Sequence, residues 1–571
     1  MRILQQHLDF IEYEPREKEI ASAEEAEKRL YRHEEIVVLF TSVEQGDDDE
    51  IAKKAIEGTK AFLAKLKVNR VIIYPYAHLS QNLARPKDAL EVLKAMERYS
   101  NEAGIETYRA PFGWNKAFQI KVKGHPLAEQ SRVYSAVATA VQAAAPPVKV
   151  STDRKADLSE EQMLARVKKS DFATLPETDH RVIGERLDLF SFQEMSPGMV
   201  YWHDKGVTLR NLLIEFIRGE LKKHGYLEVS TPALANTILW RVSGHWDHYK
   251  DNMFLTYLGD DEFGLKPMNC PSTFLFYKTR RWSFRDLPLR VADFDQLYRN
   301  ELSGVASGLF RVKVLTQDDA HIFVMEEQVE DEIKGLVDLM AMMYGVFKLD
   351  FKLRISTMPD DHIGTKEQWD GATDILKRTV LAKGLAFEMK EKEGAFYGPK
   401  IDVDIKDSLG REWQCCTIQL DFQMPKRFRL TYVGSDGKDH TPIVIHRTIY
   451  GTLERFIGIL IEHYQGRFPV WLAPVQVKVL SLSDESASYA ADIVSRLSQA
   501  GVRVEGDLES ATVGSKIRNA QLQKVPFAIV VGKKEVENQR ISVRTLDGVV
   551  KYDVGVDEFI QQVRSATVQL L

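Results

Sequence analysis

Short apolar runs alternate with amphipathic helical patterns in the first part of the chain. The runs at 37–40 (VVLF) and 71–76 (VIIYPY) are rich in β-branched residues, which is typical of buried strands. Apolar residues at helical spacing predict helices near 50–66 and 87–103. Because strands and helices alternate, we expect residues 1–142 to form an α/β domain.

The middle of the chain follows a different pattern. Residues 287–301 and 311–324 are strand-like, and the loop between them, 302–310, is rich in glycine, serine and alanine. This order predicts a long antiparallel hairpin. Residues 448–464 then carry apolar side chains, from Ile449 onward, at the spacing of a helix.

Two changes in composition divide the chain. Residues 143–177 contain adjacent prolines and mixed polar residues, which is typical of a linker. Residues 474–571 return to alternating strand and helix patterns and predict a compact α/β domain of a common size. The central domain therefore has expected bounds of 178–473, and the whole chain is expected to combine α/β and α+β domains.

Composition and charge narrow the class of protein. A length of 571 residues is enough for about three to four domains. The net charge is −6, from 77 basic and 83 acidic residues, so contact with RNA must depend on local basic patches. Cys270 and the adjacent pair Cys415 and Cys416 suggest no disulfide framework, which favours a reducing compartment. Neither a signal peptide nor a long apolar stretch is evident, so we expect a cytoplasmic protein without membrane partners.

Three residues of the kind that bind metal ions are scattered through the central domain. Cys270, His321 and His446 lie far apart in sequence, and no local zinc-finger spacing explains them. Taken singly, a cysteine is most often a small core residue and a histidine a hydrogen-bonding surface residue. If the three meet in the fold, they leave a zinc ion with an open coordination position, as catalytic sites have.

Three arginines suggest a phosphate ligand. Arg299 ends one arm of the predicted hairpin, Arg311 opens the other, and Arg455 lies at the predicted helix that follows. Guanidinium groups make bidentate contacts to phosphate oxygens, although a single arginine is more often a surface or ion-pair residue. The chain has no GxxxxGK[ST] loop and no clear GxGxxG, so a nucleotide would be bound without either glycine loop.

The string from 179–192 to 468–477 resembles threonyl-tRNA synthetase, a class II aminoacyl-tRNA synthetase. Its three class motifs are matched by GYLEVSTP (225–232), YRNE (298–301) and GTLERFIG (451–458). More specific matches are SGHWDHY (243–249), KPMNCP (266–271), TQDDAHIF (316–323), AFYGPKID (395–402), WQCCTIQLDF (413–422) and VIHRTIYGTLER (444–455). The resemblance implies a central antiparallel sheet flanked by helices, and a homodimer that forms through the first motif.

The resemblance also implies a reaction. A threonine–tRNA ligase activates L-threonine with ATP to threonyl-adenylate and transfers it to tRNA(Thr). On this reading Arg299 and Arg455 hold the ATP phosphates, Arg311 holds the γ-phosphate end, and Glu301 contacts the adenine side. Magnesium ions, Mg²⁺, would bind with the ATP phosphates.

A zinc ion, Zn²⁺, is implied at Cys270, His321 and His446. Zinc can bind the amino nitrogen and the hydroxyl oxygen of threonine, whereas the side chain of valine has no group that it can bind. A hydrophobic pocket alone discriminates between threonine and valine by only about 10²-fold. His245 matches a histidine that relays a proton during transfer to tRNA, and its alternative is a structural histidine beside Trp246. The threonine pocket would be lined by Met268, Gln317, Asp319, Tyr397, Gln414 and Gln419.

Serine also has a hydroxyl, so such an enzyme needs a second, hydrolytic site. Residues 1–142 resemble the archaeal-type editing domain of the family, which shares the fold of D-aminoacyl-tRNA deacylases. The matching strings are YPYAHLS (74–80), APFGWNKAF (110–118) and KGHPLAE (123–129). His78, Lys116 and Glu129 fall on positions that act in removing serine from tRNA, whereas Asn115 and Val122 depart from the pattern.

Residues 474–571 resemble the anticodon-binding domain that several class II synthetases share. Glu535 and Arg544 match positions that read anticodon bases, and we expect no DNA partner. Basic residues expected on the RNA face are Lys516, Arg518, Lys524, Lys533 and Lys534. The alternatives are an editing-only chain and a synthetase-like RNA-binding regulator, and the complete set of zinc ligands and arginines argues against both.

Overall fold

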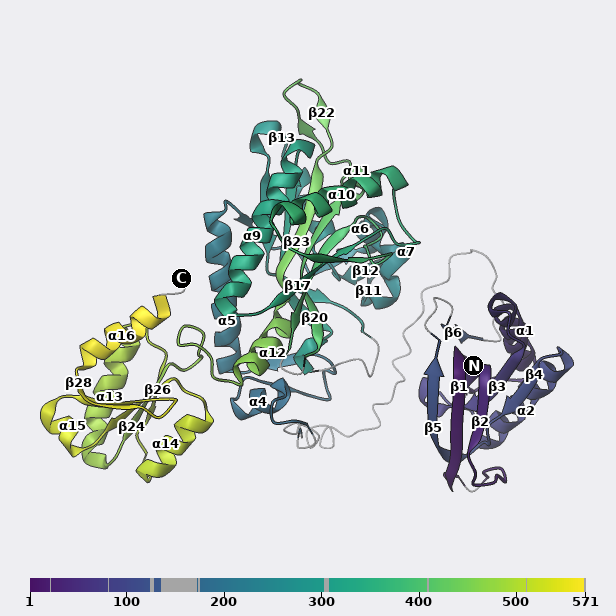
Figure 1. The fold of residues 1–571 in the computed structure, drawn as a ribbon, viewed down its shortest axis with the longest axis horizontal. Helices are drawn as coiled ribbons and strands as arrows, with labels where there is room; N and C mark the ends of the chain where they lie inside the picture. The colour runs from purple at the N-terminus through teal and green to yellow at the C-terminus, as the bar shows by residue number, and fades with distance from the viewer. Residues whose placement is uncertain are drawn as a thin grey trace. The chain divides into compact units, whose positions relative to one another are not determined.

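The protein is described by a computed structural model, and its chain divides into two compact units, Met1–Val150 and Ser151–Leu571 (Figure 1). The described residues are 1–20, 22–80, 82–123, 128–134, 172, 175–301, 308–407, 410–509 and 511–568. Most of the predicted linker lies outside them. Among the described residues, no helix has the length and apolar character needed to cross a membrane.

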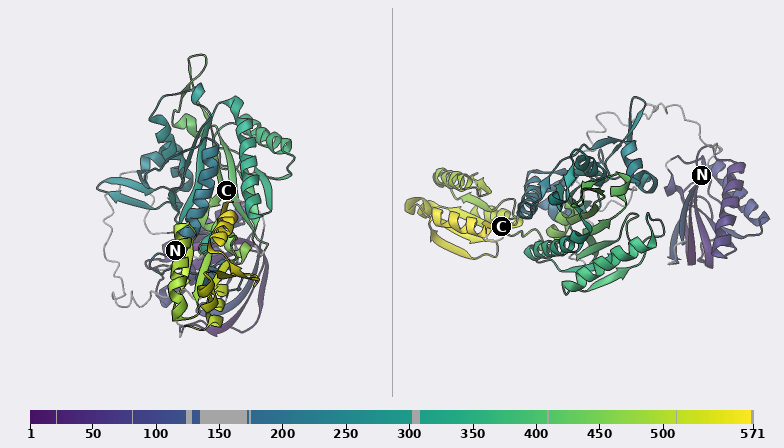
Figure 2. Two further views of the ribbon diagram at one scale, coloured as in Figure 1. Left: turned by 90° about the vertical axis from the view of Figure 1, so that its left-hand side faces the viewer. Right: turned by 90° about the horizontal axis from the view of Figure 1, so that it is seen from above.

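The first unit is a mixed sheet with helices on one face. Its elements are β1 (Arg2–Lys18), β2 (Tyr31–Ser42), α1 (Asp49–Leu66), β3 (Arg70–Pro75), η1 (Ala77–Leu79), α2 (Pro86–Glu102), β4 (Glu106–Arg109), β5 (Trp114–Val122) and β6 (Glu129–Val133). The strand order is β4-β3-β2-β1-β5, and β6 also pairs with β1. The predicted strands and helices are confirmed as β2, β3, α1 and α2, whereas the long strand β1 was not predicted. Figure 2 shows α1 and α2 side by side on the sheet.

The two faces of this sheet differ in composition. Aliphatic residues such as Val37, Leu39 and Ile73 pack under α1 and α2. The opposite face is aromatic, and the rings of Phe40 and Tyr74 lie 5.2 Å apart on it. The period-two alternation of β2 and β3 explains this difference, because successive side chains point to opposite faces.

The second unit contains the central sheet, which has the order β18-β17-β19-β20-β23-β16-β14-β9, with β15 also paired to β16. These strands are β9 (Leu227–Glu228), β14 (Leu289–Asp293), β15 (Gln296–Tyr298), β16 (Val314–Val324), β17 (Phe351–Ser356), β18 (Phe387–Lys390), β19 (Lys400–Lys406), β20 (Glu412–Asp421) and β23 (Ile443–Thr452). The helical elements are α4 (His180–Arg186), α5 (Asp204–Lys223), α6 (Thr237–Ser243), α7 (His245–Tyr249), η2 (Lys250–Asn252), α8 (Cys270–Lys278), η3 (Phe284–Asp286), η4 (Gly308–Phe310), η5 (Glu326–Gln328), α9 (Val329–Phe347), α10 (Lys366–Ala382), α11 (Met424–Arg427) and α12 (Leu453–Tyr464).

Smaller sheets and hairpins border the central sheet. They are formed by β7 (Phe190–Phe192), β8 (Val200–Trp202), β10 (Leu234–Asn236), β11 (Leu255–Leu258), β12 (Asp261–Leu265), β13 (Trp282–Ser283), β21 (Tyr432–Val433) and β22 (Asp439–His440). The predicted antiparallel hairpin is confirmed, because β14 pairs with β16 from Leu289 opposite Phe323 to Asp293 opposite Asp319.

The helix predicted over 448–464 is only partly correct. Strand β23 continues to Thr452, and helix α12 begins at Leu453. Strand β23 is bonded on both sides, to β16 and to β20, and Ile449 is fully buried within it. Two ladders of backbone hydrogen bonds outweigh a local helical periodicity, because buried backbone groups must be paired.

The end of the chain forms a separate α/β layer. Its elements are β24 (Val477–Ser481), α13 (Asp484–Gln499), β25 (Val504–Asp507), α14 (Val513–Leu522), β26 (Phe527–Val531), α15 (Lys533–Asn538), β27 (Ile541–Thr545), β28 (Val550–Val554) and α16 (Val556–Val568). The sheet order is β25-β24-β26-β27-β28, with parallel pairing around β24 and antiparallel pairing after β26. The predicted alternation is confirmed.

Candidate functional site

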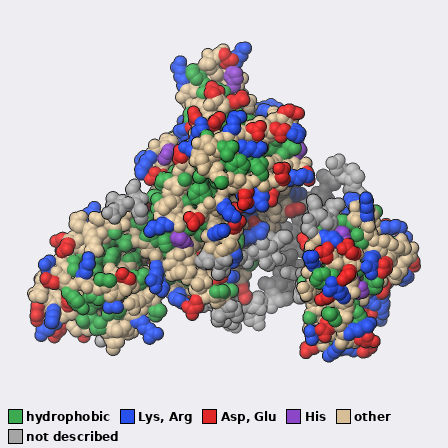
Figure 3. Space-filling model, viewed as in Figure 1, with side chains coloured by type: hydrophobic (Ala, Val, Ile, Leu, Met, Phe, Trp, Pro, Cys, Tyr) green, Lys and Arg blue, Asp and Glu red, His purple; other side chains and the backbone are tan. Residues whose placement is uncertain are grey.

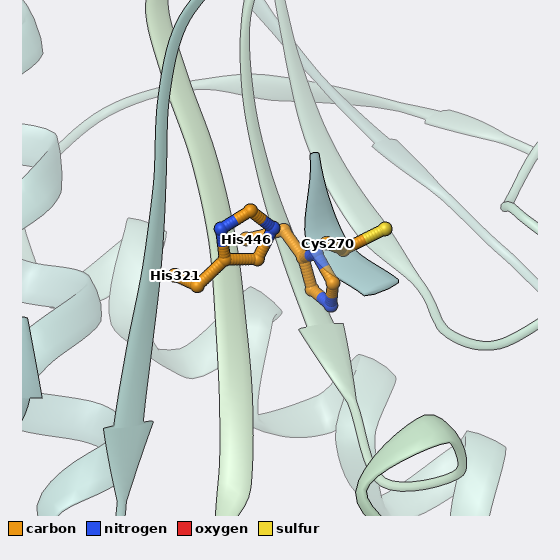
Figure 4. Close-up of side chains that lie close together, drawn as sticks. All are labelled: Cys270, His321 and His446. Carbon is orange, nitrogen blue, oxygen red and sulfur yellow. The ribbon is translucent and has the colours of Figure 1, made fainter. Parts of the chain in front are cut away.

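The three scattered metal-type residues lie together in the folded chain. Cys270 is the first residue of α8, while His321 on β16 and His446 on β23 form a directly opposed cross-strand pair. Their potential ligand atoms all lie within 4.8 Å of one another, and Figure 4 shows the two rings side by side next to the cysteine. Zinc binds sulfur and nitrogen at ~2.0–2.3 Å, so donors this close can converge on one ion.

The state of the donors fits a metal ion. All three side chains are buried, and among the described residues the Nδ1 atom of His321 has no hydrogen-bond partner. Burial holds the pKa of His321 well below its ordinary value, which keeps the ring neutral and a lone pair available. Burial also raises the pKa of the Cys270 thiol, and a bound cation would reverse that effect. One sulfur and two nitrogens suit zinc with an open position.

A buried carboxylate orients one of these candidate ligands. The Oδ2 atom of Asp421 lies 3.0 Å from the Nε2 atom of His446. Its Oδ1 atom accepts hydrogen bonds from the backbone N–H groups of Gln423 and Met424, at 2.8 and 3.0 Å. Carboxylates in this position fix the ring of a ligating histidine and raise its basicity. Asp421 was not among the predicted site residues, although it lies inside the matched string 413–422 and is the last residue of β20.

Replacing Asp421 with asparagine is expected to weaken metal binding by about 10- to 100-fold, the usual cost of losing such a partner. Competition with a chromophoric chelator measures the affinity. Asp404→Asn is the matched control, because Asp404 is equally buried on β19 but pairs with Arg354. Equal metal affinity in the two variants would contradict the role of Asp421.

A cavity of about 340 Å³ lies beside the three donors. It is large enough for an amino acid, and all six predicted threonine-pocket residues and one of the three predicted phosphate arginines contribute to its wall. Those residues are Met268, Arg299, Gln317, Asp319, Tyr397, Gln414 and Gln419. Residues that the sequence reasoning missed also line it, including His248, Phe396, Lys400 and Thr417.

Hydrogen bonds hold the polar side chains of this cavity in place. The Tyr397 hydroxyl donates to Gln419 Oε1 at 3.0 Å, and Gln414 Nε2 donates to Thr417 Oγ1 at 2.9 Å. Asp319 accepts from Asn269 Nδ2 at 3.2 Å, and burial raises its pKa. These fixed donors and acceptors suit a small polar ligand whose orientation matters.

The predicted phosphate arginines come together from separate elements. Arg455, in the first turn of α12, donates to the carbonyl oxygens of Phe310 at 3.0 Å and Gln414 at 2.7 Å. Burial lowers its pKa, and the nearby charges of Arg299 and Arg311 lower it further. Several cations at close quarters, one of them partly buried, make a site for an anion.

Glu301 and Arg311 form an ion pair. The Arg311 guanidinium donates from Nε and Nη2 to Glu301 Oε2, at 3.0 and 2.7 Å. About half of the Arg311 side chain is exposed, so the guanidinium can be approached by a ligand. The predicted contact of Glu301 with adenine remains a prediction.

His245 is part of the packing under the cavity wall. It is fully buried, its Nδ1 atom lies 2.8 Å from Ser243 Oγ, and its Nε2 atom lies 2.9 Å from Met268 Sδ. Burial lowers its pKa to about 3. The ring packs edge-on against Trp240 rather than against the expected Trp246. This arrangement is compatible with a neutral structural histidine, and the role of His245 as a proton relay remains a prediction.

The first unit has its own cavity, of about 390 Å³, where β2 and β3 end, and both aromatic residues of the sheet and residues of α2 line it. Lys116 on β5 lines it, and Tyr74 and Trp114 contribute to its wall. The Lys116 ammonium donates to the carbonyl oxygens of Pro111 and Trp114, at 2.9 and 3.0 Å. Burial lowers its pKa to about 8.

The structure does not bring Glu129, another predicted editing residue, to this lysine. Glu129 is exposed and lies opposite Gln6 on β1, whereas Lys116 lies opposite Pro15 on the same strand. Nine residues of extended strand separate the two positions by roughly 30 Å. The backbone of His78 lies in η1, and its side chain is outside the described residues.

The C-terminal domain corrects one expectation. Lys516 is buried and donates to the carbonyl oxygens of Ser481 and Asp507, at 3.0 and 2.9 Å, so it supports the fold and does not lie on an RNA face. Glu535 caps α15 through the N–H of Gly532 and accepts from Ser542 at 2.6 Å.

Arg544 lies two residues beyond Ser542 on β27 and therefore on the same face of the sheet as Ser542, the residue that contacts Glu535. Figure 3 shows hydrophobic side chains gathered on the visible face of the C-terminal domain, whereas the visible face of the first unit carries charges of both signs. The roles of Glu535 and Arg544 in reading bases remain predictions.

Comparison with known protein families agrees with this three-part layout. Residues 1–134 match the archaea-specific editing domain of threonyl-tRNA synthetase. Residues 255–464 match the class II tRNA synthetase core domain of the enzymes for G, H, P, S and T, and residues 476–566 match the anticodon-binding domain.

Individual relatives point the same way. A threonine–tRNA ligase of Desulfatibacillum aliphaticivorans is 51% identical over 385 residues, which is 67% of this chain, and the chain spans about 60% of the length of such curated relatives. A solved structure of the RNA-binding domain of threonyl-tRNA synthetase from Cryptosporidium parvum is 40% identical, with a TM-score of 0.66, and covers 68% of this chain and 98% of its own. The chain therefore belongs to the threonyl-tRNA synthetase family, and its first domain is of the archaeal editing type.

Proposed function

We propose that this protein is a threonine–tRNA ligase that activates L-threonine with ATP and transfers it to tRNA(Thr). The observation that carries the proposal is the gathering of Cys270, His321 and His446 at the wall of a cavity that also contains Arg299. The cavity is large enough for an amino acid, and the arginines beside it supply the charge that a triphosphate needs.

In this proposal Arg299, Arg311 and Arg455 hold the phosphates, together with Mg²⁺ on the phosphate oxygens. The threonine carboxylate attacks the α-phosphorus, a bond to the bridging oxygen breaks, and pyrophosphate leaves. Charge develops on the transferred group during this step, and fixed guanidinium groups stabilise it without reorganising. The hydrogen bonds of Arg455 to two backbone carbonyls hold its guanidinium in place before ATP arrives.

Zn²⁺ held by the three donors would act as a Lewis acid that coordinates the amino and hydroxyl groups of threonine. Asp319 and Tyr397 lie in the same wall and offer hydrogen bonds to those groups. Valine lacks the hydroxyl, so these polar groups would stay unpaired when valine is bound. A buried polar group without a partner weakens binding more than the loss of an apolar contact does. Serine keeps the hydroxyl and requires a second site.

The first unit would supply that site by hydrolysing Ser-tRNA(Thr). The cavity lined by Lys116 is the candidate location, because it joins a lysine of lowered pKa to aromatic walls on which a base can stack. The neutral amine could accept a proton from the attacking water. The C-terminal domain would hold the anticodon of the same tRNA, and two copies of the chain would form the homodimer.

Hydrolysis of Ser-tRNA(Thr) is expected to fall about tenfold per pH unit below pH 8, because the Lys116 amine, whose pKa is about 8, becomes protonated. Lys116→Arg, which keeps a permanent cation, should be as inactive as Lys116→Ala. Single-turnover deacylation, corrected for spontaneous hydrolysis, measures both effects. Lys121→Ala is the control, because Lys121 lies exposed on the same strand. Unchanged hydrolysis by Lys116→Ala would remove this lysine from the mechanism.

Threonine-dependent exchange of pyrophosphate into ATP tests the charging reaction with metal-loaded protein. Exchange with threonine, and much weaker exchange with valine, is the expected result. No exchange with zinc-loaded protein would overturn the proposal. An editing-only chain or an RNA-binding regulator has no need of the arginine cluster and metal donors described above, and nothing in the site favours either.

A further inference from the structure

A buried histidine lies behind the arginine cluster and does not touch the cavity. His180, the first residue of α4, is fully buried, and its Nδ1 atom lies 2.9 Å from Glu462 Oε1 on α12. Its Nε2 atom accepts a hydrogen bond from the backbone N–H of Leu309 at 3.0 Å. The ring therefore connects two helices to the short segment η4.

These contacts fix the tautomer of His180. The backbone N–H of Leu309 can only donate, so Nε2 must be the unprotonated nitrogen. The proton is then on Nδ1 and is donated to Glu462, a carboxylate that is itself fully buried. Asp179 lies 3.6 Å from the same nitrogen, and Arg411 lies 3.6 Å from the other oxygen of Glu462. A carboxylate that holds one nitrogen fixes the direction of the other.

The segment that His180 holds leads directly into the phosphate site. Gly308 has φ +55°, and a Cβ atom there would lie 2.3 Å from His180 Nε2, so the backbone approaches the ring more closely than another residue allows. The Phe310 ring lies 4.2 Å from the His180 ring, and the Phe310 carbonyl accepts the hydrogen bond from Arg455 Nε. Arg311 is the next residue in the chain.

We propose that His180 is a positioning residue for ATP binding, and that the chain from Glu462 through His180 and Leu309 sets the place of Arg455 and Arg311. This inference rests on the proposed function, because it takes ATP as the ligand of Arg299, Arg311 and Arg455. His180 holds the backbone N–H of Leu309, and Arg455 donates to the carbonyl oxygen of Phe310, the next residue of η4. Loss of the hydrogen bond between His180 and Leu309 therefore frees the Phe310 carbonyl, which positions Arg455, to move. Threonine binding uses other residues and is unaffected.

Two substitutions separate this role from simple packing. The amide oxygen of glutamine reaches the position of Nε2, so His180→Gln can still accept from Leu309. The amide of asparagine reaches only the position of Nδ1, so His180→Asn keeps the partner Glu462 and loses Leu309. We expect His180→Asn to raise the Kd for Mg–ATP and the KM for ATP by about tenfold, the effect of one lost hydrogen bond to a buried backbone group. His180→Gln should stay within about threefold, and the KM for threonine should not change in either variant.

Direct binding of Mg–ATP by calorimetry and the exchange reaction are measured with the full chain and bound metal. Equal ATP affinity in the wild type and in folded His180→Asn would overturn the inference, as would an equal rise of the KM values for ATP and threonine. Where His180→Asn lowers the melting temperature strongly, Glu462→Leu replaces it, because leucine cannot accept the proton of His180 Nδ1. An unchanged Kd for ATP in that variant overturns the inference. Wild-type protein that binds ATP but shows no threonine-dependent exchange would contradict the proposed function and leave the effect of His180 on ATP binding measurable.

Discussion

Replacing Cys270 with alanine is expected to remove the bound metal ion and to lower threonine-dependent exchange by at least ~10²-fold. Loss of a residue that is hydrogen-bonded to a metal ligand lowers metal affinity or activity by ~10- to 100-fold, and loss of one of the three ligands lowers them further. The thiol lies in a buried site next to two histidines. Burial keeps the ring of His321 neutral, and the ring of His446 is hydrogen-bonded to Asp421. Metal content per chain and the exchange rate are the two measurements.

Cys416→Ala is the matched control for this variant. Cys416 is as deeply buried as Cys270, but it lies on β20 in the main hydrophobic core. The Cys416→Ala protein should keep its metal ion and most of its exchange activity. The substitution should lower only the free energy of unfolding. A Cys270→Ala protein that retained one equivalent of zinc would contradict the assignment of the site.

The same variant should also lose its discrimination against valine. The residual exchange of Cys270→Ala is expected to differ between threonine and valine by no more than the ~10²-fold that a hydrophobic pocket provides. In the wild type the ratio should be much larger, because valine leaves buried polar groups unpaired. Rates of exchange with each amino acid at saturation and below it give the ratio of kcat/KM.

Replacing Arg455 with alanine is expected to lower kcat/KM for ATP by about 10²- to 10³-fold, the usual cost of one donor that stabilises developing charge. The side chain is partly buried and donates to the carbonyl oxygens of Phe310 and Gln414. Arg455→Lys should restore little of the loss, because a single ammonium cannot keep both carbonyl contacts and still present a planar pair of donors to phosphate. Exchange kinetics at varied ATP concentration measure the effect.

Arg378→Ala is the control for general loss of positive charge. Arg378 lies on the exposed surface of α10, where its guanidinium is 3.8 Å from Glu330, and exposed pairs of this kind contribute little. Its kcat/KM for ATP should stay close to that of the wild type. An Arg455→Ala protein with normal kcat/KM for ATP would exclude this arginine from the phosphate site.

Local patterns predicted much of the fold. The strand runs near 37–40 and 71–76 and the hairpin built from 287–301 and 311–324 are all found in the structure. Strand β1 was missed, because it mixes polar and apolar residues and is stabilised by partners on both edges. The start of α12 was placed too early for a related reason, since residues up to Thr452 are held in the sheet by neighbours distant in the sequence.

The chain by itself determined which residues are candidates for the chemistry. Cys270, His321 and His446 and the three arginines stand in specific strings, and those strings are local properties of the sequence. Only the tertiary structure decided which of them meet, because strand register sets side-chain neighbours. Register places His321 opposite His446, whereas it separates Lys116 from Glu129 along β1. Burial was decided in the same way: His245 and Lys516 are enclosed by elements far from them in sequence, which no local pattern records.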